Sequence, residues 1–429
     1  MRKVQILLII ALLPCLLPRL LHFFVTAIPI DFDAYYTAAV LAREHQGMAI
    51  YSGADTGQDP QRRLAGPGTV FAKTANRVGA VLPNLYVYPP ILADMLIPIT
   101  IVPLGTAFTI WTVINYGLLP IIAAVITRLL RLRWLSWGSL VVFLAAVSFR
   151  PIVIGIFLGQ VVIVLLLLWA CGILFYMKGF HNASGAAFAL AIAIKLTPLI
   201  VIAPLLIWKE WKILRGILVS LVFLALLICI INTPASLIDY FAHVMPAMSH
   251  GPLFVDDLSL SSSVELVLIA LNHKILLENT SVSLATGTLL LGKLCAVAIL
   301  AVACLLTYRN RRNVGIQDRL IIISLFAMLS ACLAPVSWVH AYSICLIALS
   351  FLWAEALRKG IPDGQLVVLF VCTFLLNSYL GKFSWILSAK GGNSLLYGVL
   401  MLSTPFAGSL LALERLAVFG RNARHVEKA

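Results

Sequence analysis

Charged residues are scarce in this sequence. Asp, Glu, Lys and Arg together make up 11% of the chain, whereas soluble domains contain about 25%. Hydrophobic residues reach 62%, against about 45–50% in soluble domains. Alternating segments of about 10 residues, which are typical of membrane β-barrels, are also missing. These departures exclude a soluble multidomain protein and predict an all-α polytopic membrane protein.

Acidic residues are the rarer of the two charge types, with 17 Asp and Glu against 31 Lys and Arg and a net charge of +14. The basic residues do not form one patch, which argues against a nucleic-acid partner. They occur in short groups at the ends of apolar runs: "MRK" at the start, "RLLRLR" (128–133), "WKEWK" (208–212), "YRNRRN" (308–313), "LRKG" (357–360) and the "RNARH" tail. Such groups are typical of cytoplasmic membrane anchors.

Motifs for several kinds of chemistry are absent from the sequence. The eight cysteines lie inside apolar runs without CxxC spacing, so they predict packing residues and neither disulfides nor metal ligands. No GxGxxG, P-loop, HExxH or GxSxG motif stands in a suitable context. We therefore expect no cofactor, and no motif indicates a divalent metal. With no repeat or low-complexity tract, residues 1–429 are predicted to form a single domain.

Long apolar runs, by contrast, recur throughout the chain and predict about twelve spans. The expected spans are 4–28, 89–104, 106–127, 134–150, 153–177, 184–207, 213–232, 283–307, 318–338, 341–357, 364–380 and 395–416. The first resembles a signal peptide, but its apolar core is too long, so we expect a retained helix. An even number of spans and two basic ends place both termini in the cytoplasm. The "RLLRLR" group then falls outside, so the Pro-rich 89–104 span could instead be re-entrant.

Two long segments, about 29–88 and 233–282, are expected to be extracytoplasmic loops. The first begins with "IDFDAYY", in which Asp31 and Asp33 follow the first apolar run. These acids could be part of a solvated helix end with interfacial Tyr35 and Tyr36. Alternatively, one aspartate could act as a general base on a hydroxyl group. On a helix the two carboxylates diverge by about 200°, so only one could face a given site.

Further polar and aromatic residues interrupt the apolar runs. Tyr88 precedes the helix that starts at Pro89–Pro90, and Gln160 could either tie helices together or belong to a site. Lys195 lies inside an apolar stretch, where a charge usually faces a cavity or an ionic partner. The remaining candidates are Arg150, a membrane anchor or phosphate ligand, and the Trp338 and His340 pair at the outer end of a span.

Five pieces of sequence occur in the same order as in glycosyltransferase family 87: "DFDAYYTAAVLAREHQGMAIY", "YPP", "GQ", "GAAFALAIAIKLTPL" followed by "WKEWK", and "APVSWVH". The chain resembles this family of membrane enzymes of the GT-C fold, which use polyprenol-phosphate sugars, over most of residues 25–345. The family pattern of Asp, a large apolar residue, two variable residues and Tyr matches Asp31 to Tyr35. The resemblance implies that Asp31 is the catalytic base, with Asp33 as runner-up, and that Gln160, Lys195 and His340 bind substrate.

The resemblance implies an inverting transfer of a sugar from a polyprenyl-phosphate carrier to an envelope glycolipid or polysaccharide. A mannose-like hexose is favoured, and a pentose stays an alternative. Asp31 would deprotonate the acceptor, and Lys195, Arg150 or His340 would stabilise the departing phosphate. The aromatic side chains would bind substrate by stacking on the sugar or lining the lipid entrance: Tyr35, Tyr36, Tyr88 and Trp338. We expect a bacterial cytoplasmic membrane protein with an extracytoplasmic active site. A transporter or flippase of polyprenyl-linked sugar and a non-catalytic scaffold are the competing classes.

Overall fold

The computed structural model describes residues 29–52, 68–80, 84–249, 257–271, 286–378 and 394–426. The predicted first span, 4–28, lies outside the described residues, as do parts of both predicted extracytoplasmic loops. One contiguous cluster of buried side chains extends from Phe32 to Leu416. The assignment of residues 1–429 to a single domain stays a prediction.

All regular elements in the described part of the chain are helices, which confirms the predicted class. The α-helices among the described residues are α2 (Ile30–Arg43), α3 (Val70–Val78), α4 (Pro90–Leu96), α5 (Leu104–Leu129), α6 (Trp137–Ser148), α7 (Arg150–Phe157), α8 (Val162–Met177), α9 (His181–Ile194), α10 (Ile202–Ile207), α11 (Trp211–Ile231), α12 (Pro234–Asp239), α13 (Met245–Ser249), α14 (Leu260–Leu271), α15 (Thr286–Asn310), α16 (Ile316–Cys332), α17 (Cys345–Lys359), α18 (Asp363–Ser378) and α20 (Ser394–Val426). Short segments between them are η1 (Gly47–Ala49), η2 (Ile97–Ile101), η3 (Thr197–Val201), η4 (Tyr240–Val244) and η5 (Val339–Ile344).

Several of these helices are long and apolar enough to cross a membrane. Five pass this test within the described residues, and α6 with α7 forms a sixth span if the pair, bent by 46°, is taken as one. In α11 and α15 only 17% of the apolar window is buried inside the protein, as expected for helices that face lipid. The chain is therefore a multi-pass membrane protein, and the total of twelve spans stays a prediction.

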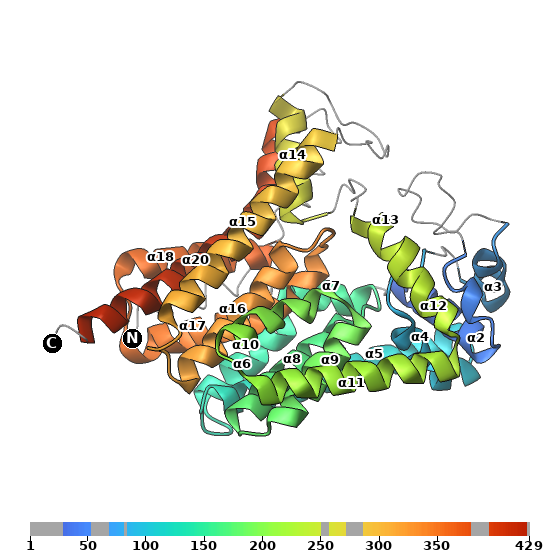
Figure 1. The fold of residues 1–429 in the computed structure, drawn as a ribbon, viewed down its shortest axis with the longest axis horizontal. Helices are drawn as coiled ribbons and strands as arrows, with labels where there is room; N and C mark the ends of the chain where they lie inside the picture. Colours follow the sequence, from blue (N-terminus) through green and yellow to red (C-terminus); the bar gives the residue numbers. More distant parts are fainter. Residues whose placement is uncertain are drawn as a thin grey trace.

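The helices form an elongated body in which α8 and α9 lie between two end groups (Figure 1). The blue helices α2 to α4 lie at one end and the orange α16 to α18 at the other, while α11 runs along one side. Close packing of α9 on α11 requires glycine, because a Cβ atom at Gly185 would lie 2.5 Å from the carbonyl oxygen of Ile213. Small residues of this kind allow membrane helices to approach closely.

Three predicted spans are interrupted. The predicted span 153–177 is divided between α7 and α8 at residues 158–161, and 184–207 breaks at Lys195, whose backbone is extended. The predicted span 318–338 ends at Cys332, and Pro335 follows. Pro198 lies three residues after the break at Lys195, and Pro335 lies three residues after Cys332. Proline favours such breaks because it removes a backbone donor and clashes with the preceding turn. Irregular backbone at membrane depth is tolerated where it lies inside protein or lines a cavity.

The described residues at the start of the predicted 29–88 loop form a buried helix. This helix, α2, is buried from Phe32 to Ala42, and it packs on α3, α4 and η2. The expectation of a solvated helix end is therefore wrong for α2. The physical reason is its residue pattern, since "FDAYYTAAVLA" offers aromatic and small apolar side chains on every side of the helix, as in helices buried all round.

Candidate active site

The break between α7 and α8 supports the N-terminal end of α2. Gly159 has φ +72°, and a Cβ atom there would lie 2.7 Å from Cβ of Phe32, so only glycine fits without strain. The indole Nε1 of Trp111 donates to the carbonyl oxygen of Gly159 at 2.9 Å. The N–H of Asp31 donates to the carbonyl oxygen of Leu158 at 3.3 Å. The first turn of α2 is therefore held against this break, next to Gln160.

Gln160 joins two tyrosines that are remote in sequence. Its Oε1 accepts hydrogen bonds from the hydroxyl of Tyr35 at 2.8 Å and from that of Tyr88 at 3.0 Å. Burial, with a smaller contribution from the negative charge of Asp31, raises the pKa of Tyr88 above its ordinary value, so this hydroxyl stays a neutral donor. Gln160 is 1% exposed, and its Nε2 has no hydrogen-bond partner among the described residues. A buried donor without a partner is costly, and a ligand oxygen would satisfy it.

Asp31 and Lys195 are electrostatically coupled beside this hydrogen-bonded group. Asp31 is half-buried in the first turn of α2, and its charge acts on both Tyr88 and Lys195. The Nζ of Lys195 lies 5.8 Å from the centroid of the Tyr88 ring, within cation–π range. Asp33 is almost fully buried, at 3% exposed. The two carboxylates thus lie in different surroundings on one helix, in accordance with the expected divergence.

His340 and Trp338 approach the same group from η5 and the segment before it. His340 is 1% exposed and close to α7, where a Cβ atom at Gly155 would lie 3.6 Å from its own Cβ. The charge of Lys195 acts on His340, and the Trp338 and His340 rings are 5.7 Å apart. Neither ring nitrogen of His340 has a hydrogen-bond partner within the described chain.

Two predicted site residues lie elsewhere. The hydroxyl of Tyr36 donates to the carbonyl oxygen of Val102 at 2.7 Å, so this side chain is directed towards the segment after η2. Arg150 begins α7, and its backbone N–H donates to Oδ1 of Asn377. The eight residues of α7 span about 12 Å, which separates Arg150 from Gln160 along the helix axis.

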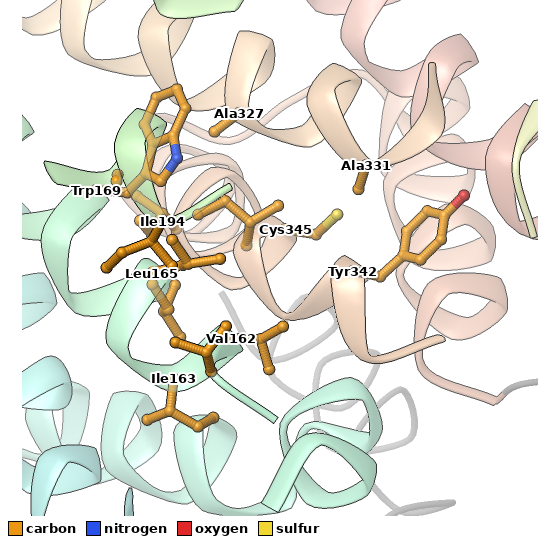
Figure 2. Packing of buried hydrophobic residues seen from close by; sticks show 14 of the residues in the cluster. Val162, Ile163, Leu165, Trp169, Ile194, Ala327, Ala331, Tyr342 and Cys345 are labelled. Atoms are coloured by element: carbon orange, nitrogen blue, oxygen red, sulfur yellow. The ribbon is translucent and has the colours of Figure 1, made fainter. Parts of the chain in front are cut away.

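A partly open pocket adjoins Lys195. Val162, Leu165, Trp169, Ala331 and Ile344 line it together with Lys195. Figure 2 shows Val162, Leu165 and Trp169 of α8 on one side and Ala327 and Ala331 of α16 facing them. The wall is mainly apolar, and Lys195 is the one charged residue in it. Such a pocket suits an amphipathic ligand that combines hydrocarbon with an anionic group.

Comparison with known families identifies the chain. The family model described as glycosyltransferase family 87 matches residues 86–334, more than half of the sequence. The chain belongs to glycosyltransferase family 87. No curated protein and no solved structure matches. Family membership, together with the apolar helices, makes this chain a membrane glycosyltransferase with a sugar donor and an acceptor.

The part of the chain that matches family 87 contains Tyr88, Gln160 and Lys195, whereas Asp31 and His340 lie outside it. The structure brings these two parts together around the breaks near residues 160 and 195. In the described residues of this family 87 member, no three His, Cys, Asp or Glu side chains form a group that could hold a metal ion.

Sequence reasoning missed several residues that support the site in this family 87 protein. Gly159 and Trp111 shape the break, and the glycine of the "GQ" pair was the available signal. Asp257 lies in the second predicted loop, 233–282, and was not among the candidate residues. It is fully buried and bonded to the backbone of Ser337, next to Trp338. No local pattern indicates this contact, because 80 residues separate its two members.

Proposed function

We propose that this protein transfers a sugar from a polyprenyl-phosphate carrier to the hydroxyl group of an envelope glycolipid or polysaccharide, with inversion at the anomeric carbon. One observation carries the proposal: Lys195 lies on the wall of a mainly apolar pocket, with its Nζ 5.8 Å from the centroid of the Tyr88 ring, whose hydroxyl binds Gln160. A cation in the wall of a mainly apolar pocket fits a lipid phosphate. A mannose-like hexose remains our preferred sugar.

Asp31 is the proposed general base. Its half-buried carboxylate would take the proton of the acceptor hydroxyl, and the oxygen would then attack the anomeric carbon from the face opposite the phosphate. The bond from that carbon to the phosphate oxygen breaks, and the lipid phosphate leaves with the electron pair. A phosphate monoester is a stable anion, so one base suffices. Asp33 is the weaker candidate because it diverges by about 200° from Asp31 on α2, and Asp31 is the carboxylate whose charge acts on Lys195 and Tyr88.

Lys195 and His340 are the proposed ligands of the departing phosphate. Preorganised cations and donors stabilise charge that develops in the transition state. The unpartnered Nε2 of Gln160 would donate to the sugar or phosphate, and Tyr88, Tyr35 and Trp338 would line the sugar site. Arg150 and Tyr36 are less favoured ligands because of where they lie.

A transporter or flippase of polyprenyl-linked sugar is the second candidate function, favoured by the broken helices and the charge within an apolar stretch. A non-catalytic scaffold is a third class. Incubation of purified protein with a polyprenyl-phosphate sugar and an acceptor distinguishes them. A transferase consumes the donor and forms a new glycosidic bond, whereas a transporter or scaffold leaves the donor intact.

The decisive variant is Asp31→Asn, which retains the shape of the side chain and removes the base. We expect transfer to fall by about 10²–10⁴-fold while the purified variant elutes as a folded monodisperse species. Asp33→Asn is the matched control on the same helix and should retain activity if it folds. Full activity of Asp31→Asn would refute its role as a general base, and loss in Asp33→Asn alone would move that role by two residues.

The proposed location is the outer face of a bacterial cytoplasmic membrane, with both termini cytoplasmic. Lys73 is exposed on α3, so a Lys73→Cys variant tests this orientation. An impermeant thiol reagent should label the variant, but not the unmodified protein, in intact spheroplasts. Labelling only after lysis would reverse the orientation.

A further inference from the structure

Asp257 is a buried carboxylate that the proposed mechanism does not use. It is 0% exposed and precedes α14. Its Oδ1 accepts the backbone N–H of Ser259 and that of Ser337, both at 2.8 Å. Its Oδ2 accepts the hydroxyl of Ser262 at 2.6 Å. The carboxylate thus connects the start of α14 to the segment that leads into η5.

Two further hydrogen bonds strengthen the same connection. The N–H of Leu258 donates to the carbonyl oxygen of Ser337 at 2.6 Å, and the hydroxyl of Tyr342 donates to the carbonyl oxygen of Leu258 at 2.7 Å. Residues 257–258 therefore hold η5 both immediately before its start and near its end. Trp338 and His340 lie between these two points of attachment.

The position of His340 depends on this backbone. No described residue makes a hydrogen bond to either nitrogen of its ring, so no described side chain fixes its orientation directly. The ring is located by the course of η5, by the packing of His340 against Gly155, and by Trp338 beside it. A change in the course of residues 337–342 would displace both rings relative to Lys195.

We propose that Asp257 is a positioning residue for the sugar transfer: by binding the backbone of Ser337, it holds Trp338 and His340 in the arrangement that receives the donor phosphate. This inference rests on the proposed function. It assigns to the segment before α14 the task of shaping the donor site, although none of its groups needs to touch the substrate.

The hydrogen bonds of Asp257 show that its side chain acts as a hydrogen-bond acceptor. In Asp257→Asn, the amide oxygen could accept the same two N–H groups, and the amide nitrogen could donate to the hydroxyl of Ser262. The connection would therefore survive the loss of the charge. In Asp257→Ala, the N–H groups of Ser259 and Ser337 would both lose their acceptor. The pair of variants separates hydrogen-bond acceptance from negative charge.

A matched control is available in a neighbouring helix pair. Thr373 on α18 accepts a hydrogen bond from Nε1 of Trp353 on α17 at 3.0 Å, and it is buried. Thr373→Val removes this buried hydrogen bond without changing η5. The activity of Thr373→Val therefore shows how much transfer is lost through a general decrease in stability.

The experiment measures hydrogen exchange and transfer kinetics on the same full-length proteins in nanodiscs, with a polyprenyl-phosphate sugar as donor. Asp257→Ala should increase exchange at the amides of Leu258 and Ser337 and lower kcat/KM for the donor by about 10–10²-fold, as expected for a misplaced ligand. Asp257→Asn and Thr373→Val should retain kcat/KM within the same order of magnitude as the unmodified protein.

Increased exchange in Asp257→Ala with unchanged donor kinetics would overturn the positioning role. Equal losses of activity in Asp257→Ala and Thr373→Val would do the same, because they would indicate a general effect of stability. An unmodified protein that transfers no sugar would instead refute the proposed function, and the exchange measurement would still report whether Asp257 holds η5.

Discussion

The hydrogen bonds at Gln160 lead to a prediction about stability: Tyr35→Phe should destabilise the unmodified protein but stabilise the Gln160→Leu variant. Gln160→Leu removes the acceptor of Tyr35 and Tyr88 with little change in volume. Leaving a buried hydroxyl without a partner costs about 1–3 kcal/mol, so two such groups cost about 2–6 kcal/mol. Removal of the buried, unpartnered Nε2 of Gln160 offsets about 1–3 kcal/mol of this cost, so the net loss in the free energy of unfolding is smaller than the sum. Tyr35→Phe in the unmodified protein loses one hydrogen bond, at about 0.5–1.5 kcal/mol.

In the Gln160→Leu background, Tyr35→Phe should instead be stabilising by about 1–3 kcal/mol, because it removes a hydroxyl that has lost its acceptor. A double-mutant cycle isolates this interaction, and unfolding by SDS in mixed micelles supplies the four free energies. Tyr36→Phe is the control, since its hydroxyl binds Val102 and not Gln160, and its effect should be equal in both backgrounds. If Tyr35→Phe is equally destabilising in both backgrounds, the contact between Tyr35 and Gln160 does not contribute to stability.

Three further predictions concern the surroundings of this group. Gly159→Ala should destabilise by about 1–3 kcal/mol, as expected for a non-glycine residue in the left-handed region. Gly117→Ala in the interior of α5, where a Cβ atom meets no atom within 4 Å, should instead stabilise by about 0.4–1 kcal/mol in the same thermal unfolding assay. Lys195→Met should lose about 2–4 kcal/mol of transition-state stabilisation and raise the donor KM; a lower melting temperature with unchanged kcat and KM would remove Lys195 from the site. Burial raises the pKa of Asp257 to about 6 although its hydrogen bonds oppose this, so the folded state binds the proton more tightly than the unfolded state. The resulting stabilisation, about 3 kcal/mol, is complete below pH 4 and is lost as the pH rises through about 6. Asp257→Asn should not show this loss. If the free energy of unfolding depends on pH in the same way in Asp257→Asn and in the unmodified protein, the assignment to Asp257 is wrong.

Sequence reasoning placed the long lipid-facing helices well. The predicted spans 106–127 and 213–232 correspond to α5 and α11 within two residues at each end, because an uninterrupted apolar run in lipid has to satisfy its backbone within one helix. It failed for α2, since acids and tyrosines at the start of a segment also occur at solvated helix ends. Burial of α2 depends on partners from α3 and α4, which a local pattern does not reveal.

The candidate site was predicted as a set of residue types but not as a geometry. Gln160, Tyr35 and Tyr88 were each proposed as binding residues, yet the hydrogen bond from Tyr35 to Gln160 joins positions 125 residues apart. Tyr36 adjoins Tyr35 in sequence and is directed elsewhere, because successive helical residues point in different directions. Asp257 carried no local signal of its role.

The interrupted helices explain why these polar residues could be recognised at all. A helix that continues through lipid needs no side chain to satisfy its backbone, so a polar residue on its lipid-facing side has only a cost. Where α9 ends at Lys195 and α16 ends before Pro335, the freed backbone groups and the polar side chains occupy the same interior space. Proline or glycine beside an isolated polar residue in an apolar run therefore indicates a site more strongly than either feature alone. The "GQ" pair and Lys195 with Pro198 both satisfy this rule. Asp257 does not, because it has no proline or glycine beside it and is not an isolated polar residue in an apolar run.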